Sequence, residues 1–186
     1  MRDGRRSISL VLGLIACLLA AQPLWAIDEP EGYRQSDYDA PVPDTVSGGL
    51  RIEDEAAFAL WRTGMVAFID VMPTLKRPKG LPEDAIWKGR SRNSVPGAIW
   101  LPDAGFGTLD AKAEDQFRAG LEAATQGNPD APVVFLCRAD CWMSWNASKR
   151  AIAWGYTRVF WYAFGSTGWE FQNYPIERLK PFHRQE

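Results

Sequence analysis

The sequence predicts an α/β domain in which helices cover both faces of a central parallel sheet. Continuous apolar runs rich in β-branched residues recur along the chain, as expected of strands that are buried on both faces. Segments of helical periodicity lie between these runs, and glycine or proline punctuates the boundaries. Strands that alternate with helices form right-handed crossover units, and ligands then bind beyond the carboxyl ends of the strands.

The first half of the domain is expected to hold one short helix and two strands. Asp54 precedes a helical segment over residues 55–62 (EAAFALWR), and Gly64 ends it. The apolar runs over residues 66–71 (VAFIDV) and 98–102 (AIWLP) predict the two strands.

A long loop over residues 72–97 separates these two strands, and its length is unusual for a compact domain. It is rich in basic residues, namely Lys76, Arg77, Lys79, Lys88, Arg90 and Arg92. These charges fit a solvated loop. They also fit a basic rim that attracts an anion or an acidic protein, with Arg90 and Arg92 as contacts. The sequence leaves both interpretations open.

The second half repeats the alternation of helix and strand. An amphipathic segment over residues 110–126 ends at Gly127 and predicts a helix. A third strand follows over residues 132–136 (PVVFL). A second long helix is expected from Ser144 up to Gly155, and residues 158–162 (RVFWY) predict the fourth strand.

The ends of the chain predict export and a single domain. Residues 1–26 have the pattern of a secretory signal peptide, in which three arginines precede an apolar stretch and small residues follow. We therefore expect a periplasmic mature protein. Residues 27–49 are expected to form an extended arm, residues 50–180 the domain and residues 181–186 a C-terminal tail.

Composition excludes several classes of function. Without residues 1–26 the chain has 18 basic and 22 acidic residues. This chain thus lacks the excess of basic residues that is typical of nucleic acid binding proteins. Its cysteines are then Cys137 and Cys141, and its one histidine, His183, lies near the end. These residues do not suffice for a serine-histidine-aspartate triad, a zinc site or covalent haem attachment. We expect no metal and no resident cofactor.

Cys137 directly follows the third strand, at the place where ligands bind in such sheets. The segment Arg138–Met143 is expected to form a loop before a helix that Ser144 or Asn146 caps. Backbone N–H groups of this loop, including that of Ala139, would stabilise a Cys137 thiolate and lower its pKa. Arg138 would add to this effect, whereas Asp140 would oppose it or accept loop N–H groups.

Cys141 is expected to act with Cys137. Cysteines four residues apart in a tight loop can approach to disulfide distance. The pair would then be a resolving pair in redox chemistry or a structural bridge, and a bridge would prevent Cys137 from carrying sulfur. A bridge across so short a loop constrains little chain entropy, which argues against a purely structural role.

Trp142 and Trp145 lie three residues apart and are expected on one side of a helix. They fit core packing, because tryptophan buries a large apolar area. Trp142 alternatively offers a platform for an aromatic ligand, such as a quinone, or for a partner's cofactor edge, with Trp145 and Asn146 as further contacts. Lys149 and Arg150 are expected to face solvent.

The ordered blocks IDV, VPGAIWLP, VVFLC, RVFWY and GSTGW resemble those of a rhodanese domain from about Ile52 to Trp169. The resemblance implies a rhodanese-like fold in which Cys137 carries a persulfide and Gly165, Gly168 and Trp169 form a late turn. Met72 stands where that family often has an arginine.

The blocks YDAPVPDTVSGG, VPGAIWLPDAGFG and ADCWMSWNASKRA are similar to the exported CxxCW-motif proteins associated with alcohol catabolism that depends on pyrroloquinoline quinone (PQQ). The spacing of Cys137 and Cys141 departs from the spacing in that family label. This resemblance implies a periplasmic quinoprotein dehydrogenase or a cytochrome c as partner.

Three functional classes therefore remain open. Cys137 accepts sulfur from a small anionic donor and passes it on. Alternatively, Cys137 and Cys141 cycle between dithiol and disulfide, or deliver electrons or a metal ion to a partner. In the third class, a bridged Cys137–Cys141 pair belongs to a binding or assembly module without catalysis.

Overall fold

The computed structural model describes residues 27–74, 77–85 and 91–183. The expected signal peptide over residues 1–26 lies outside the described residues, as do Lys76, Lys88 and Arg90 of the basic loop. Among the helices of these three described ranges, none is both long and apolar enough to cross a membrane.

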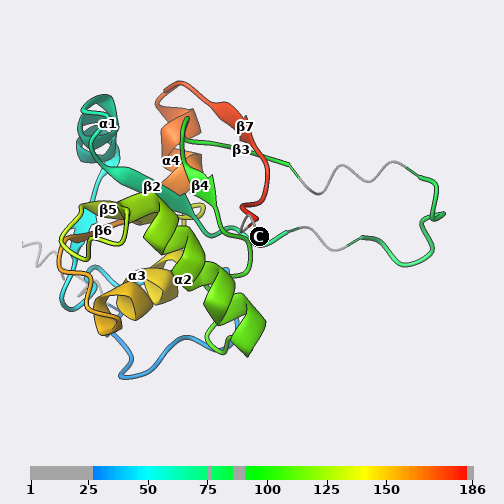
Figure 1. Cartoon of the computed structure of the whole chain (residues 1–186), viewed down its shortest axis with the longest axis horizontal. Helices are drawn as coiled ribbons and strands as arrows, with labels where there is room; N and C mark the ends of the chain where they lie inside the picture. The colour runs from blue at the N-terminus through cyan, green and yellow to red at the C-terminus, as the bar shows by residue number, and fades with distance from the viewer. Residues whose placement is uncertain (1–26, 75–76, 86–90, 184–186) are drawn as a thin grey trace, which may run out of the picture.

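The centre of the molecule is a sheet of parallel strands, as the apolar runs predicted (Figure 1). Its spatial order is β1 (Leu50–Ile52), β6 (Val159–Tyr162), β5 (Val133–Leu136), β2 (Ala67–Asp70) and β4 (Ile99–Trp100). A second, two-stranded antiparallel sheet pairs β3 (Arg92–Ser94) with β7 (Glu177–Leu179). The four strands expected from apolar runs are all present in the central sheet, and β1 is an addition.

Helices cover both faces of the central sheet (Figure 1). One face is covered by α2 (Ala111–Thr125) and α3 (Trp142–Ala153). The other is covered by α1 (Asp54–Arg62) and α4 (Gly165–Phe171), and the late turn expected at Gly165 is thus the start of a short helix.

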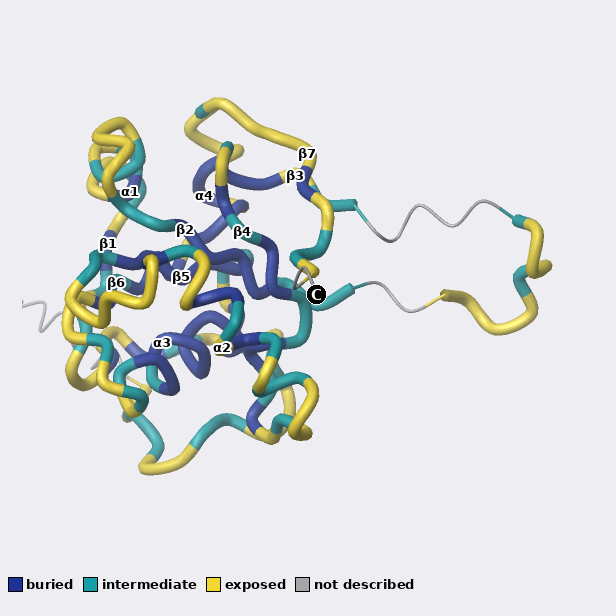
Figure 2. Tube along the Cα trace, in the orientation of Figure 1, coloured by how far each residue is buried: buried dark blue, intermediate teal, exposed yellow. Residues whose placement is uncertain are grey.

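Two apolar cores follow from the alternation of side chains along the strands. Ile69 and Phe135 point toward α2 and α3, whereas Phe68 and Val134 point toward α1 and α4. Figure 2 shows β2, β5 and α3 as largely buried segments, whereas β7 is mostly exposed. This double burial explains why β5 is apolar throughout and why β2 is apolar up to the buried Asp70.

The start of α3 differs from the prediction, since the helix begins at Trp142 rather than near Ser144. Every residue of α3 from Trp142 to Ser148 is buried, so the first half of the helix has no solvent-exposed side. Its sequence therefore lacks the alternation of apolar and exposed polar positions that marks an amphipathic helix. Helical periodicity therefore could not locate its first turn.

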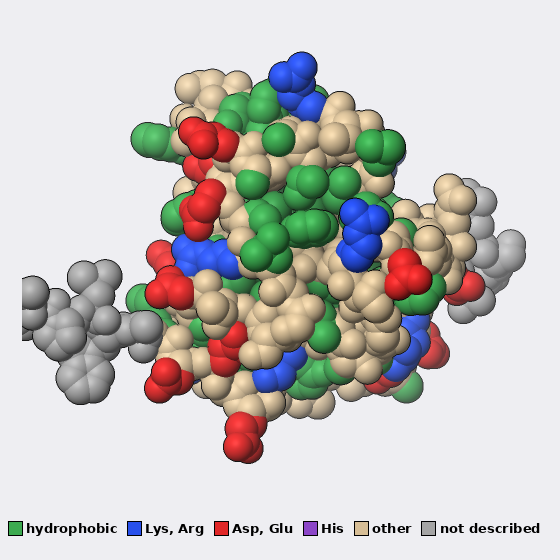
Figure 3. Space-filling view, turned by 90° about the vertical axis from the view of Figure 1, so that its left-hand side faces the viewer, with side chains coloured by type: hydrophobic (Ala, Val, Ile, Leu, Met, Phe, Trp, Pro, Cys, Tyr) green, Lys and Arg blue, Asp and Glu red, His purple; other side chains and the backbone are tan. Residues whose placement is uncertain are grey.

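Acidic and basic side chains are interspersed around a hydrophobic area on the face shown in Figure 3. Neither sign of charge forms a continuous patch there. Residues 77–85 extend away from the domain in Figure 1, so this part of the basic loop lies away from the central sheet.

Candidate active site

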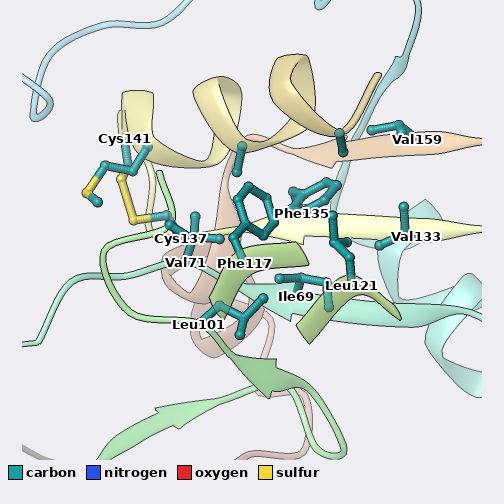
Figure 4. Packing of buried hydrophobic residues seen from close by; sticks show 14 residues of the cluster. Ile69, Val71, Leu101, Phe117, Leu121, Val133, Phe135, Cys137, Cys141 and Val159 are labelled. Carbon is teal, nitrogen blue, oxygen red and sulfur yellow. A yellow bond between two sulfur atoms is a disulfide. The ribbon is translucent and has the colours of Figure 1, made fainter. Parts of the chain in front are cut away.

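A disulfide joins Cys137 and Cys141 at the carboxyl end of β5, with 6.2 Å between their Cα atoms. We call residues 137–141 the cysteine loop. Figure 4 shows both cysteines at one end of the apolar core, beside Val71, with Val133 and Val159 at the other end. Cys137 is fully buried and Cys141 nearly so. The structure thus places Cys137 where the sequence predicts a reactive residue and pairs it with Cys141.

The start of α4 supports the cysteine loop from one side. The backbone N–H of Ser166 donates to the Cys137 carbonyl over 3.0 Å, and Arg138 forms an isolated antiparallel bridge with Gly165. Gly165 has a φ of +51°, and a Cβ there would lie 2.7 Å from the Cys137 carbonyl oxygen. A glycine is therefore needed for this close approach of the two backbones.

The Arg92 side chain also donates to the Cys137 carbonyl. Its Nη2 atom donates to the Cys137 carbonyl over 2.8 Å and to Ser166 Oγ over 2.9 Å, while its Nε forms a short ion pair with Asp70. The Asp70 carboxylate is fully buried and also accepts from Ser94 Oγ and from the Met72 N–H. Arg92 is therefore held in place by a buried ion pair, and its predicted role as a ligand contact stays a prediction.

Burial raises the pKa of the Asp70 carboxyl above its usual value. The Arg92 guanidinium and the hydrogen bonds from Ser94 and the Met72 N–H oppose this rise. The ion pair thus makes the buried carboxylate tolerable at the end of β2, next to the cysteine loop.

Two backbone N–H groups of the cysteine loop and the start of α3, those of Ala139 and Trp142, are bonded to groups other than Cys137. The Ala139 N–H donates to Thr167 Oγ1 over 3.2 Å, and the Trp142 N–H donates to the Tyr38 carbonyl over 2.9 Å. Asp140 is exposed and has a φ of +51°, a conformation that aspartate tolerates better than most residues. Neither Ala139 nor Trp142 is free to stabilise a thiolate with its N–H.

The N-terminal arm, residues 27–49, lies across the cysteine loop. Asp39 forms an isolated antiparallel bridge with Cys141, and the Ala40 N–H donates to the Asp140 carbonyl over 3.1 Å. The Asp39 carboxylate pairs with Arg138 over 2.8 Å. Arg138 therefore binds the arm, and the arm covers Cys141.

Ser144 and Asn146 are not helix caps, because α3 already begins at Trp142. Ser144 Oγ donates to the Cys141 carbonyl and accepts from Trp161 Nε1. The Asn146 side chain accepts from the Arg34 N–H and donates to the carbonyls of Arg34 and Gly105. Asn146 thus joins the arm to the loop after β4, rather than contacting an external partner.

Trp142 and Trp145 belong to the core, as the packing interpretation predicted. Trp142 is 2% exposed and Trp145 is fully buried, and their rings meet edge to face at 5.3 Å between centroids. Their indole N–H groups donate to the arm carbonyls of Pro41 and Thr45. The prediction that Trp142 forms an open platform for a quinone was wrong, since the arm covers it.

Arg150 is buried rather than solvent-facing. It donates to the carbonyls of Ala104, Phe106 and Gly107, in the loop that packs against Met143. Lys149 is also engaged, because its Nζ donates to the Pro30 carbonyl over 2.7 Å.

We expect Arg150→Met to lower the free energy of unfolding by about 2 kcal/mol, because it leaves three carbonyls without their donor. Urea denaturation followed by tryptophan fluorescence measures this loss. Arg158→Met, at an exposed position, is the matched control and should change stability by less than about 0.5 kcal/mol. Equal stability of the two variants would contradict the structural role of Arg150.

Met72 is a site residue whose contact with Cys137 the sequence did not predict. Its Sδ atom lies 3.4 Å from Cys137 Sγ, and its carbonyl accepts from Trp100 Nε1. Since a bridged cysteine has no S–H to donate, this is a packing contact between two polarisable sulfurs. Met72 comes two residues after the lone acidic residue of a buried strand. This position was the feature of the sequence that could have identified Met72 as a site residue.

A family model agrees with this architecture. The family model of the rhodanese-like domain matches residues 54–172. The chain is similar, at 15% identity and a TM-score of 0.45, to the solution structure of the 30 kDa polysulfide-sulfur transferase homodimer from Wolinella succinogenes. That match covers 71% of this chain and 80% of the other. No curated protein matches the chain. By the extent of the family match, this chain belongs to the rhodanese-like domain family.

Proposed function

We propose that this protein is a sulfur-transfer protein in which Cys137 accepts a sulfane sulfur and Cys141 releases it as sulfide. The observation that carries the proposal is the disulfide between the two cysteines at the carboxyl end of β5. Within the rhodanese-like fold this is the edge of the sheet where ligands bind. A bridge over so short a loop adds little chain entropy, so a chemical role accounts for it better than a stabilising one.

The cycle begins with reduction of the bridge by a dithiol reductant, which is itself oxidised to a disulfide. The Cys137 thiolate then attacks the outer sulfur of the donor. The bond between that sulfur and the rest of the donor breaks, the donor leaves as an anion, and Cys137 holds a persulfide.

Cys141 completes the cycle. Its thiolate attacks Cys137 Sγ, the bond from Cys137 to the carried sulfur breaks, and that sulfur leaves as HS⁻. The Cys137–Cys141 disulfide is formed again, which is the state in the structure. In sum, one sulfane sulfur is reduced to sulfide and one dithiol reductant is oxidised.

The experiment that tests this proposal is intact mass measurement with thiol counting. Protein purified without residues 1–26, and so without Cys17, should show no free thiol, and reduction should give two thiols. After removal of the reductant and addition of thiosulfate or an organic thiosulfonate, the reduced protein should gain the mass of one sulfur atom. Cys137→Ser should gain none. Reduced wild-type protein that takes up no sulfur from any donor would contradict the proposal.

We further propose that the protein works in the periplasm in support of PQQ-dependent alcohol oxidation, beside a quinoprotein dehydrogenase or a cytochrome c. The support is the signal-like pattern of residues 1–26 and the similarity of the ADCWMSWNASKRA block. A deletion strain should then grow poorly on alcohols but normally on succinate. Normal growth of that strain on alcohols would contradict this role.

One observation favours the alternative of a binding or assembly module without turnover. Cys137 is fully buried and the arm covers Cys141. In that case the Cys137→Ser and Cys141→Ser variants would both restore growth of the deletion strain on alcohols. The proposed chemistry requires that neither does.

A further inference from the structure

The sulfur of Cys137 lies in apolar surroundings. It belongs to a buried cluster with Val71, Leu101, Ala104 and Met143, and Met72 Sδ is 3.4 Å away. Apolar side chains cannot compensate a compact dianion for the loss of its hydration. They do favour the burial of an apolar organic group.

The two arginines that contact the cysteine loop are already paired. Arg92 binds the Asp70 carboxylate and the Cys137 carbonyl, and Arg138 binds Asp39. Their charge is therefore largely neutralised by a carboxylate in each case. An anionic donor gains less from them than it would from unpaired cations.

Met72, Pro73 and Trp100 form the apolar wall of a cavity of about 470 Å³, and Met72 Sδ also contacts Cys137 Sγ. The charged side chains that line this cavity are Arg92, Arg178 and Glu170. Arg92 is paired with Asp70, so the remaining charges are one arginine and one carboxylate, which balance each other.

A second cavity of about 1060 Å³ shares Ser91 and Arg178 with the first. It adds apolar walls from Leu101, Pro102 and Phe117, with Lys112 and Lys180 among its charged residues. Cys137 itself lines neither cavity, and Met72 is the residue that both lines the first cavity and contacts Cys137 Sγ.

We infer that Cys137 takes its sulfur from an organic donor with an apolar substituent, an organic thiosulfonate or persulfide, and that Met72 determines this preference. The inference rests on the proposed sulfur transfer. For a thiosulfonate, the Cys137 thiolate attacks the sulfane sulfur, the bond between the two donor sulfurs breaks, and the organic sulfinate leaves. The persulfide remains on Cys137, so atoms and electrons balance without another reactant.

The test compares benzenethiosulfonate with thiosulfate, because both carry one sulfane sulfur and differ in the apolar group and in charge. The reduced protein without residues 1–26, which leaves Cys137 and Cys141 as its cysteines, is mixed with each donor, and persulfide formation is followed by intact mass. Benzenethiosulfonate should load Cys137 at least about tenfold faster than thiosulfate at equal concentration. Methanethiosulfonate, which has the same charge as the benzene compound, should lie between them.

Met72→Arg tests the assigned residue. An unpaired guanidinium beside Cys137 should lower the ratio of the two loading rates at least about tenfold, mainly by faster loading from thiosulfate. The matched control is Met65→Arg, since Met65 is 76% exposed and the added charge is the same. Met65→Arg should keep the wild-type ratio. If Met72→Arg does not fold, Met72→Lys replaces it in the test, because lysine adds the same positive charge on an unbranched side chain.

Equal loading rates for thiosulfate and benzenethiosulfonate in the wild type would overturn the inference and leave sulfur transfer intact. An unchanged ratio in a folded Met72→Arg variant would overturn the role of Met72. If no donor adds sulfur to the reduced wild type, the proposed function itself fails, and the inference fails with it.

Discussion

Cys141→Ser is expected to accept sulfur on Cys137 but to release sulfide at least about 100-fold more slowly than the wild type. In the structure Cys141 is bonded to Cys137, so after reduction its thiolate remains within reach of the persulfide. A neighbouring group of this kind replaces a bimolecular collision with an intramolecular attack, which raises its effective concentration by orders of magnitude. A serine hydroxyl at the same position does not form the disulfide that expels sulfide.

The measurement is sulfide release under a fixed concentration of dithiol reductant, together with intact mass of the trapped protein. The loaded Cys141→Ser variant should keep the mass of one extra sulfur while the wild type loses it. Cys137→Ser serves as the control that neither loads nor releases. Release from Cys141→Ser at the wild-type rate would show that the reductant itself discharges the persulfide.

Arg92→Met is expected to lower the free energy of unfolding by about 3 to 5 kcal/mol at neutral pH. The substitution leaves the fully buried Asp70 carboxylate without its cation and removes the donor to the Cys137 carbonyl. A buried charge without a partner is among the most destabilising changes in a protein. Urea denaturation followed by tryptophan fluorescence measures the loss.

The loss should shrink as the pH falls. Burial raises the pKa of Asp70, and Arg92→Met removes the cation that opposes this rise. In the variant the folded-state pKa then lies far above the unfolded value of about 3.9. The penalty is complete above the folded-state pKa and fades as the pH falls toward the unfolded value, since a protonated carboxyl needs no cation.

The double variant Asp70→Asn/Arg92→Met removes the charge together with its partner and is the matched control. It should be more stable at neutral pH than Arg92→Met alone, and its stability relative to the wild type should depend less on pH. If both variants unfold at the same urea concentration across the pH range, the Asp70–Arg92 pair is not the cause of the loss.

The buried strands of the central sheet were predicted to within one or two residues, because burial on both faces leaves an unbroken apolar run. The helix α2 was equally clear, since Asp110 caps it and one face is apolar. β1, β3 and β7 were missed, as each has only three residues and polar or charged side chains interrupt its pattern. The start of α3 was missed because that helix is buried on all sides there.

Within the site, the sequence located Cys137 but not its surroundings. Arg92 lies 22 residues from Asp70 and 45 from Cys137, and local patterns carry no information on such contacts. Asn146 resembled a cap because short polar side chains usually bond to nearby backbone, yet its partners include Arg34, 112 residues away. The one feature of the sequence that indicated a nearby cation was the lone aspartate in a buried strand, because a buried carboxylate needs a partner.

The arm has a consequence for the order in which the chain folds. Its partners on α3 lie 100 to 119 residues further along the sequence, as the bonds of Trp145 to Thr45 and of Lys149 to Pro30 show. Contacts of such separation form only after the loop between them has closed, at a cost in chain entropy. The contacts between the arm and α3 are therefore expected to form late in folding.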